Sequence, residues 1–580
     1  MPSLENLRPF LWAALVSLLF LNYTAWQKDH PAAPEPVAAA AATKAPAADT
    51  FAQSVPTVPT APTAAPAVVP AAVPAAATPA VAAGSAPEAA AAAPVAAAPT
   101  LIHVKTDVLD LTVSTRGGDL VGLDLPDYPL HKKDPNVKVR LFDNTNEATR
   151  YLHQGGLATG ATALGKPEPN HLAVFTAQAS SYTLADGENE LRVPLTWTDG
   201  AGLTVMRTYV FKRGQYAVTV ESEVQNASNA AVNVAPYSQL LRRAAPVKSS
   251  MFNPETYAYR GPAVWDGEKY RKLKVDDEES GKFQQQIKGG WFAAMQHYFV
   301  TAIVPPGDEA WQYALQINGD DSLLRSTGPS RSVAPGTTTK LHQQLYMGPK
   351  LHDQLKATAP ELERTVDFGR LYIISTPLFH VLRFVHGFVS NWGLTIILVT
   401  LLIKLVFYKL AETSGRSMAR MRNIQPRMKA LQERYADNRE ELGKQMMELY
   451  KREKVNPIAG CLPMLVQIPF FIAFYWVLME SVEMRQAPFF GWLNDLSSMD
   501  PYFILPVIMA GAMFAQFKLN PAPADPVQAK VFAFMPLVMA VTMAWFPSGL
   551  LLYWITNTGL SILQQWHINK IVERENPTKA

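Results

Sequence analysis

Lys404 is the residue whose type and position most strongly suggest a chemical role. It lies inside an apolar run that extends from Trp392 to Tyr408 and is long enough to cross a bilayer. A lysine at the centre of a spanning helix costs about 3 kcal/mol on insertion scales, so such a residue usually faces protein or water and has a function. Alternatively, the ammonium group snorkels to nearby headgroups, because Leu410 is only about 9 Å of helix rise away. The segment alone supports both interpretations about equally.

Further polar side chains interrupt the apolar segments, where each costs free energy unless it finds a partner. Thr400 lies one turn before Lys404 on the same helix face. The acidic residues that could neutralise Lys404 are missing from these segments. Facing one another, these polar groups, with Thr556, Thr558 and Ser561 of the last apolar segment among them, could enclose a wet hollow around the ammonium group. We therefore predict a groove without catalytic residues, cofactor or metal, formed by Lys404, Thr400, Gln467, Gln516, Trp554 and Asn557.

The composition predicts an integral membrane protein. Charged residues make up 17% of the 580 residues, against about 25% in soluble proteins, and the net charge of +3 gives no sign of nucleic-acid binding. A spanning helix needs about 20 residues. Residues 1–30 fit a retained signal anchor rather than a cleaved signal peptide, because no small-x-small site follows their long apolar part. The six segments apolar enough to span are Leu7–Trp26, Trp392–Leu410, Cys461–Met479, Tyr502–Phe517, Val531–Phe546 and Leu550–Trp566.

The region between the first two spans divides into three parts. Residues 31–100 are mostly Ala and Pro and predict a disordered tether. Residues 101–348 contain short alternating strands, with a turn at Gly117-Gly118 and a hairpin around Gly214, which predict an antiparallel sandwich. Residues 349–390 hold an apolar helix interrupted by Arg and His, beginning at Val366. We expect this helix to lie in the membrane interface; a further core element of the β domain is the alternative.

A polar stretch at 412–455 predicts a helical hairpin. Its first half has an apolar stripe at Met418, Met421, Ile424, Met428, Leu431 and Tyr435. Asn438 and Glu441 predict a capping box for a second helix, which carries Leu442, Met446 and Leu449. Methionine stripes serve packing more often than client binding, although they suit both. By the positive-inside rule the hairpin, the 518–530 loop, the 571–580 tail and both termini are cytoplasmic, and the β domain lies outside.

Other function classes have weaker support. The absence of carboxylates from the spans argues against an ion pump or cation channel. A small-solute transporter is a further alternative, although no inverted repeat of broken helices is present. The β domain could be a sugar-binding or epimerase domain, but it has no nucleophile motif or metal spacing, and fold analogy alone does not establish an activity.

Five segments carry a family resemblance, in matching order and spacing: Asn391–Thr400, Met421–Pro426, Lys454–Pro463, Ser481–Phe489 and Trp545–Trp554. Over roughly residues 350–570 the chain closely resembles the YidC/Oxa/Alb family of membrane protein insertases, in its Gram-negative type. The resemblance implies a membrane α-helical bundle with six spans and a five-helix core (residues 391–570), plus a periplasmic all-β super-sandwich domain of the sugar-mutarotase kind.

The resemblance also implies a function and a role for position 404. Family members insert and fold proteins in the bacterial inner membrane, alone or with the Sec translocon and its accessory subunits. The implied partners are nascent membrane proteins, the lipid bilayer, and ribosomes at the hairpin and tail, without sequence-specific nucleic acid. A basic residue of the first core span, usually Arg, sits in a substrate groove open to the cytoplasm and lipid. Lys404 keeps the charge but not the bidentate fork of arginine.

Overall fold

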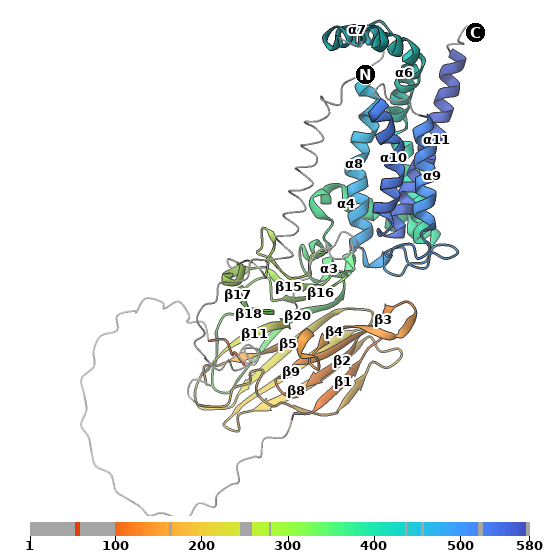
Figure 1. Cartoon of the computed structure of the whole chain (residues 1–580). Helices are drawn as coiled ribbons and strands as arrows, with labels where there is room; N and C mark the ends of the chain where they lie inside the picture. The colour runs from red at the N-terminus through yellow and green to blue at the C-terminus, as the bar shows by residue number, and fades with distance from the viewer. Residues whose placement is uncertain are drawn as a thin grey trace, which may run out of the picture.

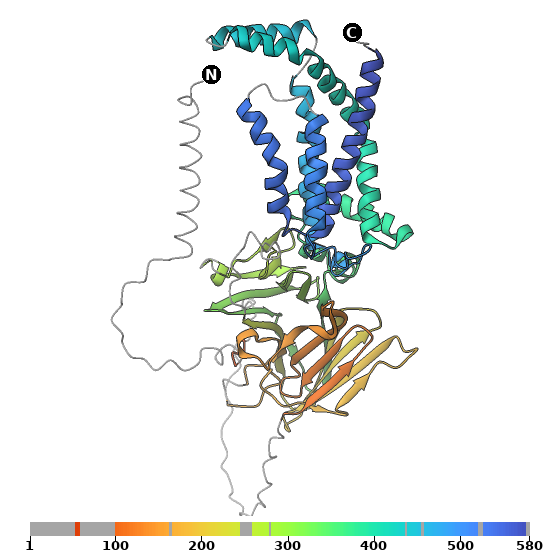
Figure 2. The same ribbon diagram turned by 45° about the vertical axis from the view of Figure 1, so that its right-hand side comes forward.

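The computed structural model describes residues 53–57, 99–161, 165–243, 258–275, 277, 280–435, 438–453, 457–519 and 526–575. A β domain and a helical bundle lie end to end, and the helices α8 to α11 run side by side (Figures 1 and 2). The predicted anchor at 1–30 lies outside the described residues, as does most of the 31–100 tether. Within the tether, Ser54 is seated on the β domain: its carbonyl oxygen and Oγ accept hydrogen bonds of 2.7 and 2.6 Å from Arg325 Nη2.

Within the described residues, the β domain consists of two sheets. Their inner faces share one hydrophobic core, and all pairings are antiparallel except that of β1 with β7. The first sheet has the order β14 (Gln284–Lys288), β17 (Ala310–Asn318), β18 (Asp321–Thr327), β11 (Val232–Arg243), β5 (Tyr151–Ala158), β4 (Asp134–Asp143), β3 (Leu120–His131), β2 (Asp110–Ser114), β1 (Leu101–Lys105) and β7 (Ser181–Thr183), with β19 (Arg331–Val333) on β11. The second has the order β13 (Tyr270–Lys272), β12 (Pro262–Trp265), β15 (Trp291–Met295), β16 (Phe299–Val304), β20 (Thr337–Pro349), β10 (Ala217–Asn226), β9 (Leu203–Lys212), β8 (Glu190–Thr198) and β6 (Thr176–Ala177). The predicted sandwich is confirmed.

The predicted hairpin around Gly214 shows why this region forms sheets. Strands β9 and β10 pair antiparallel, and Gly214 adopts a φ of 70° in the turn between them. Alternate residues of both strands, such as Val205 and Val218, are buried in the core. The period of two places one face of each strand toward the other sheet and leaves the opposite face more polar.

The segment between the sandwich and the bundle is shorter in helix than predicted. It contains α3 (His352–Thr358), the 3₁₀ turns η6 (Leu362–Thr365) and η7 (Gly369–Leu371), and α4 (Tyr372–Val389). The predicted helix start at Val366 was wrong, because Val366 and Phe368 are buried in the shared core instead of continuing a helix. Helix α4 lies at the end of the bundle that faces the β domain (Figure 2) and leaves Phe388 76% exposed.

The helices of the bundle differ from the predicted segments mainly at their ends. The second predicted span, 392–410, breaks at Phe407, where α5 (Trp392–Val406) and α6 (Tyr408–Arg434) meet at 69°. The hairpin therefore begins at 408 rather than 412 and continues into α7 (Arg439–Arg452). The last helix runs through 575, so the tail predicted at 571–580 begins as helix. The remaining helices are α8 (Pro457–Glu480), α9 (Ile504–Leu519), α10 (Pro526–Met543) and α11 (Ser548–Glu575).

Length and hydropathy identify fewer spans than the sequence predicted. Within the described residues, α4 alone is both long and apolar enough to cross a membrane, and the bent pair α5 and α6 would make a second span. Three further apolar helical stretches are shorter: Val466–Glu480, Ile504–Leu519 and Ala533–Met543. The six-span arrangement stays a prediction.

Candidate functional site

Lys404 lines a small pocket between α5, the start of α6, α8 and α11. Its volume is about 40 Å³, which is room for about three water molecules. In this state the pocket is far too small for a polypeptide segment. The lining is mostly apolar: Ile403, Lys404, Phe407, Leu410, Ala411, Val466, Gln467, Phe470 and Asn557.

The ammonium group of Lys404 is held by a hydroxyl group rather than by a carboxylate. Its Nζ donates a 2.8 Å hydrogen bond to Ser561 Oγ, and Ser561 Oγ in turn donates to the carbonyl oxygen of Asn557, also at 2.8 Å. Among the residues that the structure describes, none with a carboxylate lies within ion-pair distance of Lys404. The cation is half-buried and leaves its charge available to water or to a visiting group.

The structure gathers only part of the predicted groove. Gln467 and Asn557 line the pocket together with Lys404. Thr400 is buried, but its Oγ1 donates to the carbonyl oxygen of Ile396 at 2.6 Å, so its own helix satisfies this hydroxyl. Thr400 is not part of the pocket lining.

Two predicted groove residues lie elsewhere in the bundle. Gln516 is on α9, which packs against α10 and α11, and it does not line the pocket. Trp554 packs edge-on against Phe471 of α8, with ring centroids 4.8 Å apart, and is likewise absent from the lining. Gln516 was assigned as a polar residue of its predicted span and Trp554 as the neighbour of a polar cluster, but residue type does not specify the side of a helix.

Sequence reasoning named Ser561 among the polar residues that could surround Lys404 but left it out of the predicted groove, and it missed the aromatic wall. Ser561 is one helical turn after Asn557, so the i, i+4 spacing was a usable signal. Phe407 and Phe470 form a T-shaped pair with centroids 5.2 Å apart and close one side of the pocket. A phenylalanine in an apolar segment carries no distinguishing sequence signal, and only the packing reveals this role.

The helical hairpin extends from the pocket to the end of the bundle remote from the β domain (Figure 1). Its predicted apolar seam is confirmed: Ile424 and Met428 are buried against Met421, Met446, Leu449 and Tyr450. Asn438 accepts the Glu441 backbone N–H at 3.1 Å, but Glu441 accepts from Gln445 instead of completing the capping box. Most methionines of the seam hold the two helices together, whereas Met447 is 56% exposed.

The base of the hairpin is fixed to the last helix. Gly415 of α6 lies so close to Ile568 of α11 that an added Cβ would come within 2.7 Å of its side chain. Ala419 and Val572 extend this contact along the two helices. Small residues at 415 and 419 thus allow α6 to pack closely against α11 while the tip of the hairpin projects away.

The opposite end of the bundle is joined to the β domain by buried polar contacts. Lys350 Nζ lies 3.6 Å from Glu480 Oε2 and both side chains are essentially inaccessible. Burial lowers the pKa of His297 to about 3, so its ring is neutral at pH 7 and Nε2–H donates to the carbonyl oxygen of Met479 at 2.8 Å. Arg485 donates to the carbonyl oxygen of Pro129 at 2.8 Å. These contacts make the junction specific rather than a loose tether.

The outward faces of the bundle are apolar. Val406 and Val507 are each 70% exposed and Phe534 is 67% exposed. Such extended apolar surface is rare on soluble proteins and indicates contact with lipid. Across the described residues, no group of His, Cys, Asp and Glu side chains is arranged to hold a metal ion. The fold and the site define an integral membrane protein with a β-sandwich at one end and a lone cation inside its helical bundle.

Comparisons with known proteins identify the family. Residues 101–381 match the YidC periplasmic domain and residues 384–575 match the 60Kd inner membrane protein family. The chain is 43% identical to the membrane protein insertase YidC of Thioalkalivibrio sulfidiphilus, over 98% of this chain and 99% of the relative. It is 45% identical to that of Methylococcus capsulatus, over 83% and 87% respectively. The chain belongs to the YidC family of membrane protein insertases.

A solved structure of an active YidC insertase with its first transmembrane domain resolved shares 18% identity with this chain. It covers 80% of this chain and 91% of its own length, with a TM-score of 0.35. The periplasmic match extends to residue 381, and so includes α3 and the first half of α4, which the sequence had separated from the β domain at 348.

Proposed function

We propose that the pocket around Lys404 receives the polar flank of a nascent membrane protein while the apolar part of that client enters the lipid. The observation that carries this proposal is the bond from Lys404 to Ser561 Oγ at 2.8 Å, in a pocket where no described carboxylate neutralises the charge. An acidic residue crossing the bilayer centre costs about 3 kcal/mol on insertion scales. A cation already seated there offsets part of this cost during transit.

The small volume of the pocket implies that it must open before a client binds. A space of about 40 Å³ admits water but no peptide, so the walls must part before a client enters. The α5–α6 break at Phe407 lies at the pocket and is the natural hinge, since Phe407 and Phe470 close one wall. The apolar helix of the client would then leave sideways along α8 and α10, whose exposed faces are apolar. This process needs no covalent step and no cofactor.

The proposed topology places six spans in the bacterial inner membrane, with both termini and the hairpin cytoplasmic and the β domain periplasmic. The hairpin and the end of α11 lie at one end of the bundle and the β domain at the other (Figure 1), which supports this topology. The basic hairpin and tail would meet ribosomes and nascent clients. We propose action both alone and beside the Sec translocon, as insertase and as chaperone.

The test is insertion by the purified protein in liposomes, without other proteins. A single-span client with a translocated acidic tail should become protease-protected only when the protein is present. The matched control is a protein locked by engineered cysteines at positions 407 and 470, which holds the pocket wall closed until a reductant is added. Solute flux through these liposomes without client insertion would instead assign a channel or transporter and refute the proposal.

A further inference from the structure

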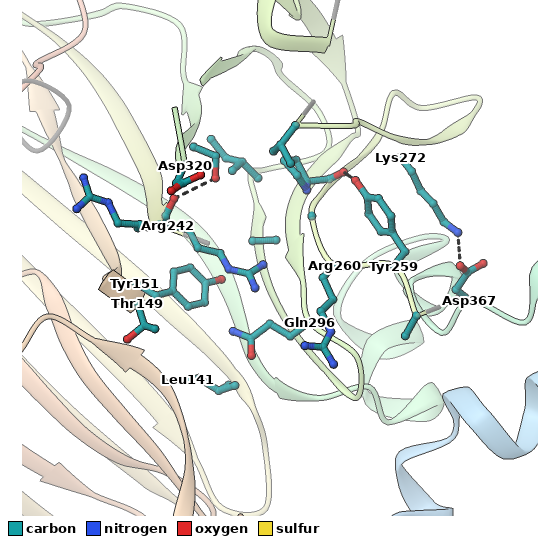
Figure 3. Close-up of a pocket in the computed structure, with 18 of the residues that line it drawn as sticks. Leu141, Thr149, Tyr151, Arg242, Tyr259, Arg260, Lys272, Gln296, Asp320 and Asp367 are labelled. Carbon is teal, nitrogen blue, oxygen red and sulfur yellow. Dashed lines mark hydrogen bonds and ion pairs between the residues drawn. The ribbon is translucent and has the colours of Figure 1, made fainter. Parts of the chain in front are cut away.

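A cavity of about 1600 Å³ lies where the β domain meets the helical bundle, at the end remote from the hairpin. Figure 3 shows its interior, with Arg242, Gln296 and Arg260 near one another. Leu371, Ile472 and Trp476 contribute an apolar wall from the helical part. The cavity thus has a cationic side in the β domain and an apolar side in the bundle. The established family membership assigns it no role.

Most cations around the cavity are neutralised by carboxylates. Arg243 pairs with Asp321 at 2.7 Å, Arg140 with Asp124 at 2.8 Å, and Lys272 with Asp367. Arg242 and Arg260 differ: within the described part of the chain neither has a carboxylate at ion-pair distance. A guanidinium group withdrawn from water normally has such a partner, since an unpaired charge in a partly dry site is costly. Arg242 is half-buried, whereas Arg260 is exposed.

The surroundings of Arg242 hold its side chain in position but leave the charge uncompensated. Its Nη1 donates to the carbonyl oxygen of Met295 at 2.9 Å, and its Cζ lies 5.5 Å from the centre of the Tyr151 ring. Burial lowers the pKa of Arg242, and the charge of Arg260 lowers it as well. The two guanidinium groups therefore repel each other, and an anion between them would relieve this repulsion as well as the desolvation cost.

The chemistry of the two arginines selects the anion. Guanidinium groups present parallel N–H donors that match the oxygens of a phosphate, and two of them can hold one phosphate from both sides. The wall of Leu371, Ile472 and Trp476 suits the carbon skeleton of an organic ester, and an acyl chain above all, rather than a free inorganic ion. Trp476 lies near the end of α8, where tryptophan is typical of the boundary between lipid and water.

We propose that this cavity binds a phosphate ester, whose phosphate lies between Arg242 and Arg260 and whose carbon skeleton lies against Ile472 and Trp476. The ester can be the headgroup of a phospholipid in the outer leaflet or a soluble glycerol phosphate. The lipid source rests on the membrane placement given under the proposed function. The binding of the phosphate group does not depend on that placement.

The test uses the full-length protein in detergent with two probes. Phosphatidylglycerol binding is followed by native mass spectrometry, with diacylglycerol as the probe that lacks the phosphate. Glycerol 3-phosphate binding is followed by titration calorimetry. Arg242→Gln and Arg260→Gln should each weaken binding about tenfold, the loss expected for one charged hydrogen-bonding partner. Arg192→Gln is the matched control, because Arg192 is exposed on β8, pairs with Glu190 at 2.9 Å and lies outside the cavity.

The binding results of the two variants and the control decide whether the site exists and which ligand it takes. Loss of phosphatidylglycerol binding in the two variants, but not in the control, supports the site with a lipid as its ligand. The same pattern with glycerol 3-phosphate alone supports the site with a soluble ester. Equal binding by the variants and the unmodified protein, or binding of neither probe, overturns the inference. Arg260 is exposed, so Arg260→Gln tests the site even if Arg242→Gln impairs folding.

The inference and the proposed function fail separately in this design. A protein that inserts clients normally but binds neither probe overturns only the phosphate site. A protein that binds the probes but does not protect any client overturns only the proposed role of the Lys404 pocket.

Discussion

The charge of Lys404 should determine how fast clients with acidic tails are inserted. Lys404→Ala removes the ammonium group but leaves the fold intact, because Ser561 Oγ still donates to the carbonyl oxygen of Asn557 at 2.8 Å. Lys404→Arg keeps the charge and should retain function. Lys404→Glu places a like charge beside an acidic client and should be worse than alanine. If Lys404 only snorkels to headgroups, alanine should be harmless or stabilising.

The size of the effect follows from simple electrostatics. A client carboxylate about 4 Å from Nζ, at an effective dielectric constant of about 20, gains about 4 kcal/mol. Part of this gain is lost, because the ammonium group must share its existing bond to Ser561 and the nearby water. About 2 kcal/mol of net stabilisation in the transition state for translocation corresponds to about a 30-fold change in rate. This figure is smaller than the roughly 3 kcal/mol cost of burying the client's acid, so the groove lowers the barrier without trapping the client.

The assay measures the rate of protease protection in liposomes for two clients that differ only by Asp or Asn in the translocated tail. Lys404→Ala should slow the Asp client about 30-fold and the Asn client far less. Lys409→Ala is the matched control, since Lys409 is on the same chain segment but its side chain is 91% exposed and pairs with Glu412 at 3.4 Å. Equal slowing of both clients, or unchanged insertion of the Asp client, would refute the reasoning.

Three further predictions test other parts of the molecule. Replacing residues 420–453 with a flexible linker should abolish insertion. Thermal unfolding of the bundle should be unchanged, because the contacts of Gly415 and Ala419 with α11 are kept. Normal insertion by this variant would reject a role for the hairpin in client capture. Lys350→Met should lower the free energy of unfolding by about 3–5 kcal/mol, since it leaves Glu480 buried without its partner. Adding Glu480→Leu should restore most of the lost stability, and additive losses of the two variants in denaturant melts would contradict this coupling. Deleting residues 101–349 should leave cells viable, because the pocket proposed to receive clients lies in the helical bundle. The deletion should end at 349 because β20 pairs with β10 and β16; lethality of a stably expressed deletion would count against it.

The sequence predicted those features that depend on local patterns. Alternation and glycine turns identified the sandwich and its hairpins, because a strand buries one face with a period of two. The stripe at Ile424 and Met428 identified the hairpin seam, because side chains three or four apart share a helix face. A lysine in an apolar segment also stands out without any structure, because its desolvation cost is a property of the residue and its neighbours in sequence.

Local patterns do not give the orientation of one helix relative to another. Gln516 and Trp554 were assigned to the groove by residue type, yet α9 and α11 place them elsewhere. The bend at Phe407 was missed because averaged hydropathy continues smoothly through it. The start of α4 was misplaced because Val366 and Phe368 are apolar enough for a helix but are buried in the core shared by the β domain and the bundle.

The sequence by itself therefore determined the two-part architecture, the hairpin and the presence of a lone cation in the membrane region. Only the tertiary structure decided that Lys404 bonds to Ser561, that the pocket is closed by Phe407 and Phe470, and that Arg242 and Arg260 line one cavity. The physical reason is that periodicity and charge are written in neighbouring residues. The partners of a buried polar group are set by how helices and sheets rotate and pack, and residues 157 positions apart, such as Lys404 and Ser561, meet only through that packing.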